Sequence, residues 1–178
     1  MLHEIMIAGF GGQGVMSMGQ LIAYSGMIEE KQVSWLPSYG PEQRGGTANV
    51  SVIVSDEEVG SPVISRPTVA IVLNKPSFDK FEPMVAPGGV LIINSSMVKQ
   101  KTSRTDIRVI EVPASEIASE LGEPMVANTV ILGAVLEVTK AVSTESVIES
   151  LKKVLSERKQ HLIPINKAAL EKGAELVK

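Results

Sequence analysis

Residues 4–14 read Glu-Ile-Met-Ile-Ala-Gly-Phe-Gly-Gly-Gln-Gly, and this stretch decides the fold. Its apolar run at residues 5–8 predicts a short buried strand, and residues 15–28 have the pattern of a helix. The glycines between them have the spacing of a phosphate-binding turn. A strand, a glycine turn and a helix N-terminus leave several backbone N–H groups unpaired, so we expect an anion to bind there.

Each glycine of the turn has an expected role. Gly9 permits a sharp exit from the strand, Gly11 lets a ligand reach the backbone, and Gly14 lets the helix pack close to the sheet. A nicotinamide-binding unit also needs an Asp or Glu at the end of its second strand. The second strand expected here, residues 33–36, runs into Pro37 without one. A free-standing dinucleotide-binding protein is therefore the alternative from a different class, and the missing acid disfavours it.

Composition limits the remaining classes. The 178 residues are 44% hydrophobic and 21% charged, which predicts a single globular domain over residues 1–178. The net charge of -3 disfavours nucleic-acid binding. No apolar stretch reaches the roughly twenty residues needed to cross a bilayer, and no signal peptide is recognisable, so we expect no membrane association and a cytoplasmic location.

Metal and thiol chemistry are not expected within this chain. It has no cysteine, which excludes disulfides, thiol catalysis and cysteine-ligated iron–sulfur clusters in its own sequence. The two histidines, His3 and His161, are far apart and have no carboxylates at ligand spacing. We expect ordinary surface or helix-end roles for both.

Strands and helices alternate along most of the chain. Strands are expected at residues 32–36, 47–54, 68–73, 90–93 and 107–112, and helices at residues 77–81, 115–121, 129–142, 144–155 and 165–177. Residues 59–64, interrupted by Gly60 and Pro62, are expected as an irregular edge segment that forms a hairpin with the strand at 47–54. The predicted fold class is α/β, a single Rossmann-like domain with a mostly parallel sheet, a β-hairpin excursion and C-terminal helices.

Polar residues gather in a loop expected at residues 37–46. The loop contains Tyr39, Glu42 and Arg44 among two prolines and three glycines. One interpretation is a surface loop with an internal Glu–Arg pair. The other is a binding or subunit-contact loop in which Arg44 offers its guanidinium to a phosphate or carboxylate.

Two asparagines are expected at the carboxyl ends of strands, where ligands of open α/β sheets collect. Asn74 follows the strand at residues 68–73, and Asn94 follows the strand at residues 90–93. Asn74 has a second interpretation as the cap of the next helix.

The combination of two motifs is more specific than either alone. Gly-Phe-Gly-Gly-Gln-Gly at residues 9–14 and Pro-Ser-Tyr-Gly-Pro-Glu-Gln-Arg-Gly-Gly-Thr-Ala-Asn at residues 37–49 resemble the gamma subunit of 2-oxoacid:ferredoxin oxidoreductases. Leu-Asn-Lys-Pro-Ser at residues 73–77 and Asn-Ser-Ser at residues 94–96 fit the same family, and the resemblance covers nearly the whole chain. The pattern is most similar to the 2-oxoglutarate type, whose loop usually carries Met where this chain has Gln43. The beta-type subunit of indolepyruvate:ferredoxin oxidoreductase, with a related Gln-Arg-Gly-Gly loop, and a branched-chain 2-oxoacid enzyme are the alternatives.

The resemblance implies a subunit of a multi-chain enzyme that oxidatively decarboxylates a 2-oxoacid to acyl-CoA and reduces ferredoxin. It implies alpha, beta and delta partner subunits that hold thiamine diphosphate, magnesium and the iron–sulfur clusters. It also implies that the isolated chain is inactive and that this subunit contacts coenzyme A. Gly9 and Tyr39 belong to the two matching motifs and complete the expected contact set.

Our hypothesis for the site follows from the phosphates of coenzyme A. Gly11, Gly12, Gln13 and Gly14 are expected to donate to a phosphate, with Asn74 and Asn94 on the same rim. Glu42 and Arg44 are expected to engage the ligand or the neighbouring subunit. A competing interpretation is that both glycine loops only allow close backbone contact at a subunit interface.

Overall fold

The computed structural model describes residues 1–39 and 47–178. Within them, six strands form one sheet in the order β2-β3-β1-β4-β5-β6. The strands are β1 (Leu2–Phe10), β2 (Gln32–Tyr39), β3 (Thr47–Ser55), β4 (Val69–Val72), β5 (Val90–Asn94) and β6 (Arg108–Val112). β1, β4, β5 and β6 are parallel, whereas β3 runs antiparallel to both β1 and β2. The expected α/β fold with a mostly parallel sheet is confirmed.

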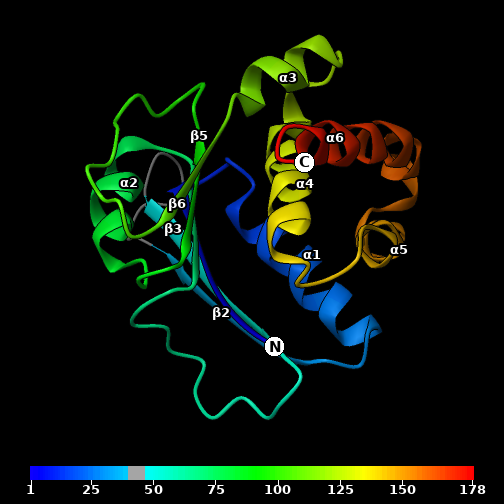
Figure 1. Ribbon diagram of the computed structural model, residues 1–178. Helices are drawn as coiled ribbons and strands as arrows, with labels where there is room; N and C mark the ends of the chain where they lie inside the picture. Colours follow the sequence, from blue (N-terminus) through cyan, green and yellow to red (C-terminus); the bar gives the residue numbers. More distant parts are fainter. Residues whose placement is uncertain (40–46) are drawn as a thin grey trace.

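The helices lie on both faces of the sheet. Figure 1 shows α1, α4, α5 and α6 on one side and α2 on the other. The helices are α1 (Val15–Ile28), α2 (Lys75–Phe81), α3 (Ala114–Glu120), α4 (Ala127–Thr139), α5 (Thr144–Val154) and α6 (Ile163–Glu175), with short 3-10 helices η1 (Glu82–Met84), η2 (Pro124–Val126) and η3 (Glu157–Leu162). In the described ranges, no helix combines the length and the apolar character that a membrane span needs.

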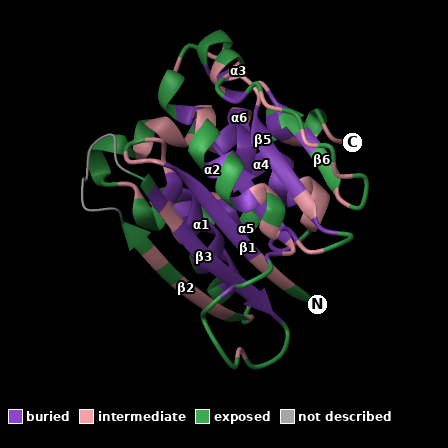
Figure 2. Ribbon diagram, turned by 90° about the vertical axis from the view of Figure 1, so that its left-hand side faces the viewer, coloured by how far each residue is buried: buried purple, intermediate pink, exposed green. Residues whose placement is uncertain are grey.

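Alternating side chains of the central strands form two cores. In β1, Ile5 and Ile7 point to the side of α1 and α4, whereas Met6 and Ala8 point to the side of α2. Figure 2 shows these central strands as buried. Because a parallel strand buried on both faces reads as a continuous apolar run, β1, β4 and β5 were recognisable from the sequence.

The edge strand β2 is longer than the sequence pattern predicted. β2 continues through Pro37 to Tyr39 and pairs with β3 along its whole length, with Pro37 opposite Val50. A proline lacks the N–H of a central ladder but is tolerated at an edge. The expectation that irregular structure starts at Pro37 is therefore wrong. The neighbour of β3 in the hairpin is β2, while residues 59–64 contain no strand.

Two glycines bring α1 close to the edge of the sheet. A Cβ on Gly19 would lie 2.7 Å from Val50 Cγ1, and a Cβ on Gly26 would lie 2.6 Å from Val33 Cγ2. The small residues on this side of the helix therefore allow it to contact β2 and β3.

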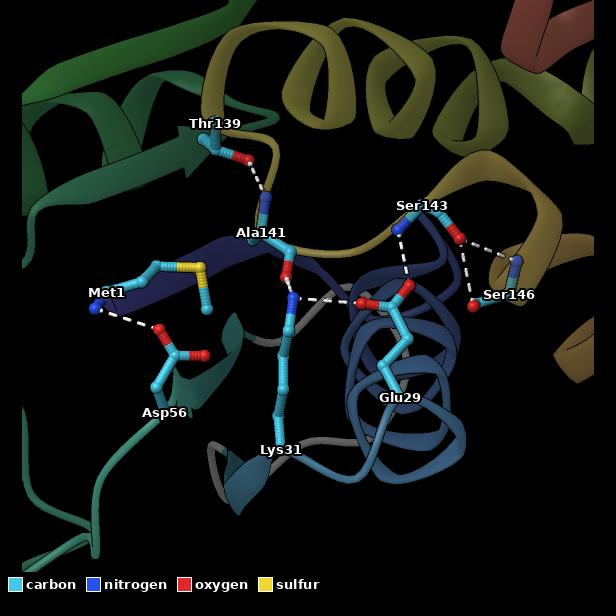
Figure 3. A network of polar contacts seen from close by, with 8 residues as sticks. All are labelled: Met1, Glu29, Lys31, Asp56, Thr139, Ala141, Ser143 and Ser146. Atoms are coloured by element: carbon cyan, nitrogen blue, oxygen red, sulfur yellow. Dashed lines mark hydrogen bonds and ion pairs between the residues drawn. The ribbon is translucent and has the colours of Figure 1, made fainter.

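A polar network joins the C-terminal end of α1 to the start of α5 (Figure 3). Glu29 accepts a 2.7 Å hydrogen bond from the Ser143 N–H and forms a 2.9 Å ion pair with Lys31. Lys31 Nζ also donates to the Ala141 carbonyl at 2.7 Å. Burial acts to raise the pKa of Glu29, but the hydrogen bonds from Lys31, Ser143 and Ser146 outweigh it and lower that pKa to about 2. The ionised Glu29 therefore stabilises this junction.

Candidate functional site

The glycine turn lies at the carboxyl end of β1 and leads directly into α1. Gly12 has a φ of 92° and Gly14 a φ of 80°, a backbone region that strongly favours glycine. Gly14 is the N-cap of α1, and no side chain caps this helix. The first turn of α1 also has no acidic residue. Its N-terminal N–H groups and partial positive charge are thus left for a ligand.

Gln13 holds the turn in shape from within. Its Oε1 accepts a 2.6 Å hydrogen bond from the Phe10 N–H, and its Nε2 donates to the Leu73 carbonyl at 3.2 Å. Its own N–H donates to the Phe10 carbonyl at 3.2 Å. In the part of the chain that the structure describes, the N–H groups of Gly11, Gly12 and Gly14 make no such bond. These three groups, like the first N–H groups of α1, are donors left for an anion.

The turn opens on a cavity of about 960 Å³. The N-terminal ends of three helices contribute to its wall: Gly14 and Val15 of α1, Ala127 and Asn128 of α4, and Leu162 before α6. Each helix N-terminus carries partial positive charge, so the three together favour an anionic ligand. Apolar side chains form the deeper wall, among them Leu21, Ile131, Leu151 and Leu155.

Most of the expected site residues meet at this cavity. Its lining includes Gly11, Gly12, Gln13, Gly14, Tyr39 and Asn94. Two further expected residues do not line it: Gly9 is buried beneath the turn, and Asn74 is 4% exposed. Glu42 and Arg44 lie outside the described residues. Tyr39 and Thr47, the described residues on either side of them, both line the cavity.

The two asparagines are engaged within the chain. Asn74 Oδ1 accepts the Ser77 N–H at 2.9 Å, which caps α2, and its Nδ2 contacts Gln13 Oε1 at 3.4 Å. Asn94 Nδ2 donates to Ser115 Oγ at 3.2 Å, and its Oδ1 accepts the Ser96 N–H at the same distance. Asn74 therefore takes the capping role and supports Gln13, whereas Asn94 keeps a place in the wall.

Gly14 has a different neighbour from the one expected. A Cβ there would lie 2.4 Å from Asn128 Nδ2 of α4, so the close approach is to that helix and not to the sheet. The Asn128 side chain also donates to the Gly14 carbonyl at 3.5 Å, a long contact. Next to it, Thr129 Oγ1 donates to Asn166 Oδ1 at 2.8 Å and links α4 to α6. These contacts join the three helix N-termini around the cavity.

Sequence reasoning did not identify two charged residues of the wall. Lys159 of η3 and Glu123 before η2 both line the cavity. Both residues are far from the glycine motif in sequence. The packing of the C-terminal half of the chain brings them to the cavity. Within residues 1–39 and 47–178, no group of three or more His, Cys, Asp or Glu side chains is arranged to hold a metal ion.

A model of the family described as pyruvate ferredoxin/flavodoxin oxidoreductase matches residues 4–176. The chain belongs to this family. The ketoisovalerate oxidoreductase subunit VorA of Methanothermobacter thermautotrophicus is 42% identical over 173 residues, which cover 97% of this chain and 36% of VorA. The 2-oxoglutarate synthase subunit KorC of Methanocaldococcus jannaschii is 33% identical over 185 residues, covering 100% of this chain and 95% of KorC. The chain thus spans about a third of VorA but nearly all of KorC.

Solved structures agree with the fold. The gamma subunit of the keto/oxoacid ferredoxin oxidoreductase from Geobacter sulfurreducens has a TM-score of 0.83 and 28% identity, with 98% of each chain covered. The 2-oxoglutarate:ferredoxin oxidoreductase from Magnetococcus marinus has a TM-score of 0.90 and 22% identity, covering 99% of this chain and 31% of that one. The expected relationship to gamma subunits of oxoacid:ferredoxin oxidoreductases is confirmed.

Proposed function

We propose that this chain is the gamma subunit of a multi-subunit 2-oxoacid:ferredoxin oxidoreductase and that its glycine turn binds a phosphate of coenzyme A. The assembled enzyme decarboxylates a 2-oxoacid oxidatively, forms acyl-CoA and reduces ferredoxin. The observation that carries the coenzyme A proposal is the uncapped N-terminus of α1, which opens on the cavity with the N–H groups of Gly11, Gly12 and Gly14 unpaired.

The cavity suits a ligand with an anionic end and a longer, less polar arm. Coenzyme A carries a diphosphate and a ribose phosphate, which match the three helix N-termini and Lys159. The volume of the cavity, about 960 Å³, lies within the range of cofactor sites. The Magnetococcus marinus oxidoreductase was solved with coenzyme A and succinyl-CoA bound, which supports this ligand for the family fold. We further propose that Tyr39, Glu42 and Arg44 contribute to the same site.

The redox chemistry belongs to other subunits in this proposal. Thiamine diphosphate and magnesium supply the decarboxylation chemistry, and iron–sulfur clusters carry the electrons, in alpha, beta and delta subunits. The present chain has no cysteine to ligate a cluster. Residues 1–178 act as one domain that binds and orients the coenzyme A phosphates. We therefore expect the isolated chain to be inactive, and we expect the complex to be cytoplasmic.

Two substrate types are supported by named relatives. The 2-oxoglutarate synthase subunit KorC aligns over nearly its full length, and we propose 2-oxoglutarate as the substrate. A branched-chain 2-oxoacid is the second candidate, because the ketoisovalerate subunit VorA is 42% identical. Assays of the co-purified complex with 2-oxoglutarate and with ketoisovalerate, each with ferredoxin as acceptor, will separate them. A ratio of kcat/KM values that favours ketoisovalerate would contradict the first proposal.

The coenzyme A proposal is tested with two matched glycine variants. Gly12 and Gly88 have φ values of 92° and 80°, and a Cβ at either position meets nothing within 4 Å. Gly12→Ala and Gly88→Ala therefore carry similar backbone strain, of about 1 kcal/mol. Only Gly12 lines the cavity. We expect Gly12→Ala to raise the apparent KM for coenzyme A of the assembled enzyme by about tenfold, a loss of about 1.4 kcal/mol, while Gly88→Ala leaves it unchanged.

The competing interpretation makes the opposite prediction. If the turn only allows close contact between subunits, Gly12→Ala will weaken assembly and leave the KM for coenzyme A unchanged. Size-exclusion chromatography of the co-purified complex measures assembly directly. That combination of results would remove the ligand role.

A further inference from the structure

Asn128 brings a carboxamide from the C-terminal half of the chain onto the glycine turn. It is the second residue of α4, it is half-buried, and it lines the cavity. A Cβ on Gly14 would lie 2.4 Å from Asn128 Nδ2 and 2.7 Å from its Cγ, so the carboxamide fills the space that a side chain at Gly14 would need. Because Gly14 is the N-cap of α1, the carboxamide lies where that helix begins, at the same cavity as the turn.

This carboxamide has only long contacts within residues 1–39 and 47–178. Its Nδ2 reaches the Gly14 carbonyl at 3.5 Å, and that carbonyl already accepts the Met18 N–H at 3.0 Å. Its Oδ1 lies 3.5 Å from Thr129 Oγ1, but the proton of that hydroxyl is used in the 2.8 Å bond to Asn166 Oδ1. Since a carboxamide nitrogen carries two N–H groups, Asn128 keeps at least one donor for a ligand.

The type of residue at this position also indicates an anion. A half-buried polar group without a hydrogen bond is unfavourable, so the carboxamide of Asn128 needs a partner. A carboxylate in the first turn of α4 would interact favourably with the helix N-terminus, yet this turn has no acidic residue. A neutral donor suits an anion bound beside it, whereas a carboxylate would repel that anion.

The packing of α4 against α6 holds the carboxamide in place. Figure 1 shows these two helices side by side. A Cβ on Gly133 would lie 2.1 Å from the Leu170 carbonyl oxygen, so the two backbones are in direct contact. The bond between Thr129 and Asn166 ties the helices together next to Asn128. Because a binding group is effective only when its neighbours fix its position, this packing preorganises Asn128 for a ligand.

We propose that Asn128 is a phosphate-binding residue of this cavity and that its Nδ2 group donates to the coenzyme A phosphate held by the glycine turn. The inference rests on the proposed function and adds to it a donor from the C-terminal half of the chain. The phosphate is then bound jointly by the N–H groups of residues 11–14 and by a side chain of α4. The competing role is structural, with Asn128 only filling the space over Gly14.

Two substitutions of Asn128 separate these roles. Asn128→Ala removes the donor, whereas Asn128→Asp keeps the shape of the side chain and replaces the donor with a negative charge. In the assembled enzyme we expect Asn128→Ala to raise the apparent KM for coenzyme A about tenfold, because a hydrogen bond to a charged group is lost. We expect a rise of about thirtyfold or more with Asn128→Asp, because like charges then meet. The kcat at saturating coenzyme A should stay at the wild-type value, since a residue that only contributes binding changes KM alone.

Gln20→Glu is the matched control for the added charge. Gln20 is also a half-buried amide, and it lies on α1 outside the cavity lining. The same amide-to-carboxylate change there should leave the KM for coenzyme A unchanged. An equal rise with Gln20→Glu and Asn128→Asp would overturn the proposal, because the net charge of the chain would then explain both. Circular dichroism and size-exclusion chromatography check folding and assembly, and if Asn128→Asp does not assemble, Asn128→Ala decides.

Failure of this inference is distinct from failure of the coenzyme A proposal. If Gly12→Ala raises the KM for coenzyme A and Asn128→Ala does not, the Asn128 inference is wrong and the role of the turn stands. A rise that is no larger for Asn128→Asp than for Asn128→Ala would also contradict the inference, because no anion then lies beside the side chain. If the KM stays unchanged with Gly12→Ala as well, the coenzyme A proposal itself fails.

Discussion

Gln13 Oε1 lies 2.6 Å from the Phe10 backbone nitrogen and accepts its hydrogen bond, so the side chain of the glycine turn closes on the backbone of the same turn. With the Nε2 bond to the Leu73 carbonyl, this residue ties the end of β1 to the end of β4. We expect Gln13→Met, which keeps the length of the side chain but removes both bonds, to lower the free energy of unfolding by about 1–3 kcal/mol. Urea unfolding of the variant and the wild-type chain measures this change in the free energy of unfolding.

Gln20→Met is the matched control for this change. Gln20 is also half-buried and lies on α1, but its side chain has no hydrogen bond within the described residues. Equal unfolding free energies for Gln13→Met and Gln20→Met would show that the Gln13 bonds do not support the turn.

Ser17 is exposed in the first turn of α1. A charged substitution at this position therefore tests whether the partial positive charge of the helix N-terminus binds an anion. A carboxylate there interacts favourably with the helix N-terminus, by about 0.5 kcal/mol, but repels a phosphate bound at the same end. Ser17→Asp should therefore leave the chain as stable or more stable while weakening coenzyme A binding severalfold. The isosteric but neutral Ser17→Asn is the control. Titration calorimetry on the assembled enzyme gives the affinity, and equal values for the two variants would contradict an anion at this position.

Gly173 makes the contact that brings α4 and α6 together. A Cβ there would lie 1.8 Å from the Val130 carbonyl oxygen, which belongs to the backbone and has little room to move. Replacing glycine by alanine in an exposed helix usually stabilises it by about 1 kcal/mol. Here we expect Gly173→Ala to destabilise the chain by about 2–3 kcal/mol because the helices must separate. Glu171→Ala, on the exposed side of α6, is the control, and thermal unfolding should place Gly173→Ala well below it.

Glu29 gives a prediction for pH. Its pKa is lowered to about 2 in the folded chain from the ordinary value of 4.5, so the folded state favours the ionised form. The stabilisation is fully present above about pH 4.5 and is lost as the pH falls toward 2. Glu29→Gln should lower the free energy of unfolding by about 2 kcal/mol at pH 7, with a smaller difference at pH 3. A wild-type advantage that stays constant between these pH values would show that the carboxylate charge is not responsible.

The sequence was sufficient for the parts of the fold that depend on local pattern. α1 runs from Val15 to Ile28 as expected, because a positive-φ glycine precedes it and charged residues follow it. The apolar runs of β4 and β5 also appear as parallel strands. The end of β2 was missed because Pro37 is acceptable only at an edge, and strand order is a property of the whole sheet.

The residues of the candidate site also fall into those that local patterns predict and those that only the complete fold brings together. The glycine turn and Tyr39 could be placed from their motifs, since strand ends and turns are local. Asn128 and Lys159 could not, because three C-terminal helices carry them to the cavity through contacts such as the one between Thr129 and Asn166. Gly14 and Asn128 are far apart in sequence, so their contact in the folded chain could not be predicted from a local pattern.

Lys159 offers a last test of the charge in the cavity. It is exposed in the cavity wall, and within the described ranges it forms no ion pair, so a bound phosphate is its available counterion. We expect Lys159→Gln to weaken coenzyme A binding about two- to fivefold at low salt, because an exposed charge pair contributes about 0.5–1 kcal/mol. The difference should disappear at about 0.5 M salt, where such pairs are screened. Lys153→Gln on α5 removes an exposed charge outside the cavity lining and should have no effect. Equal losses for the two lysine variants would mean that only the net charge of the chain matters, and the helix N-termini alone would then account for anion binding.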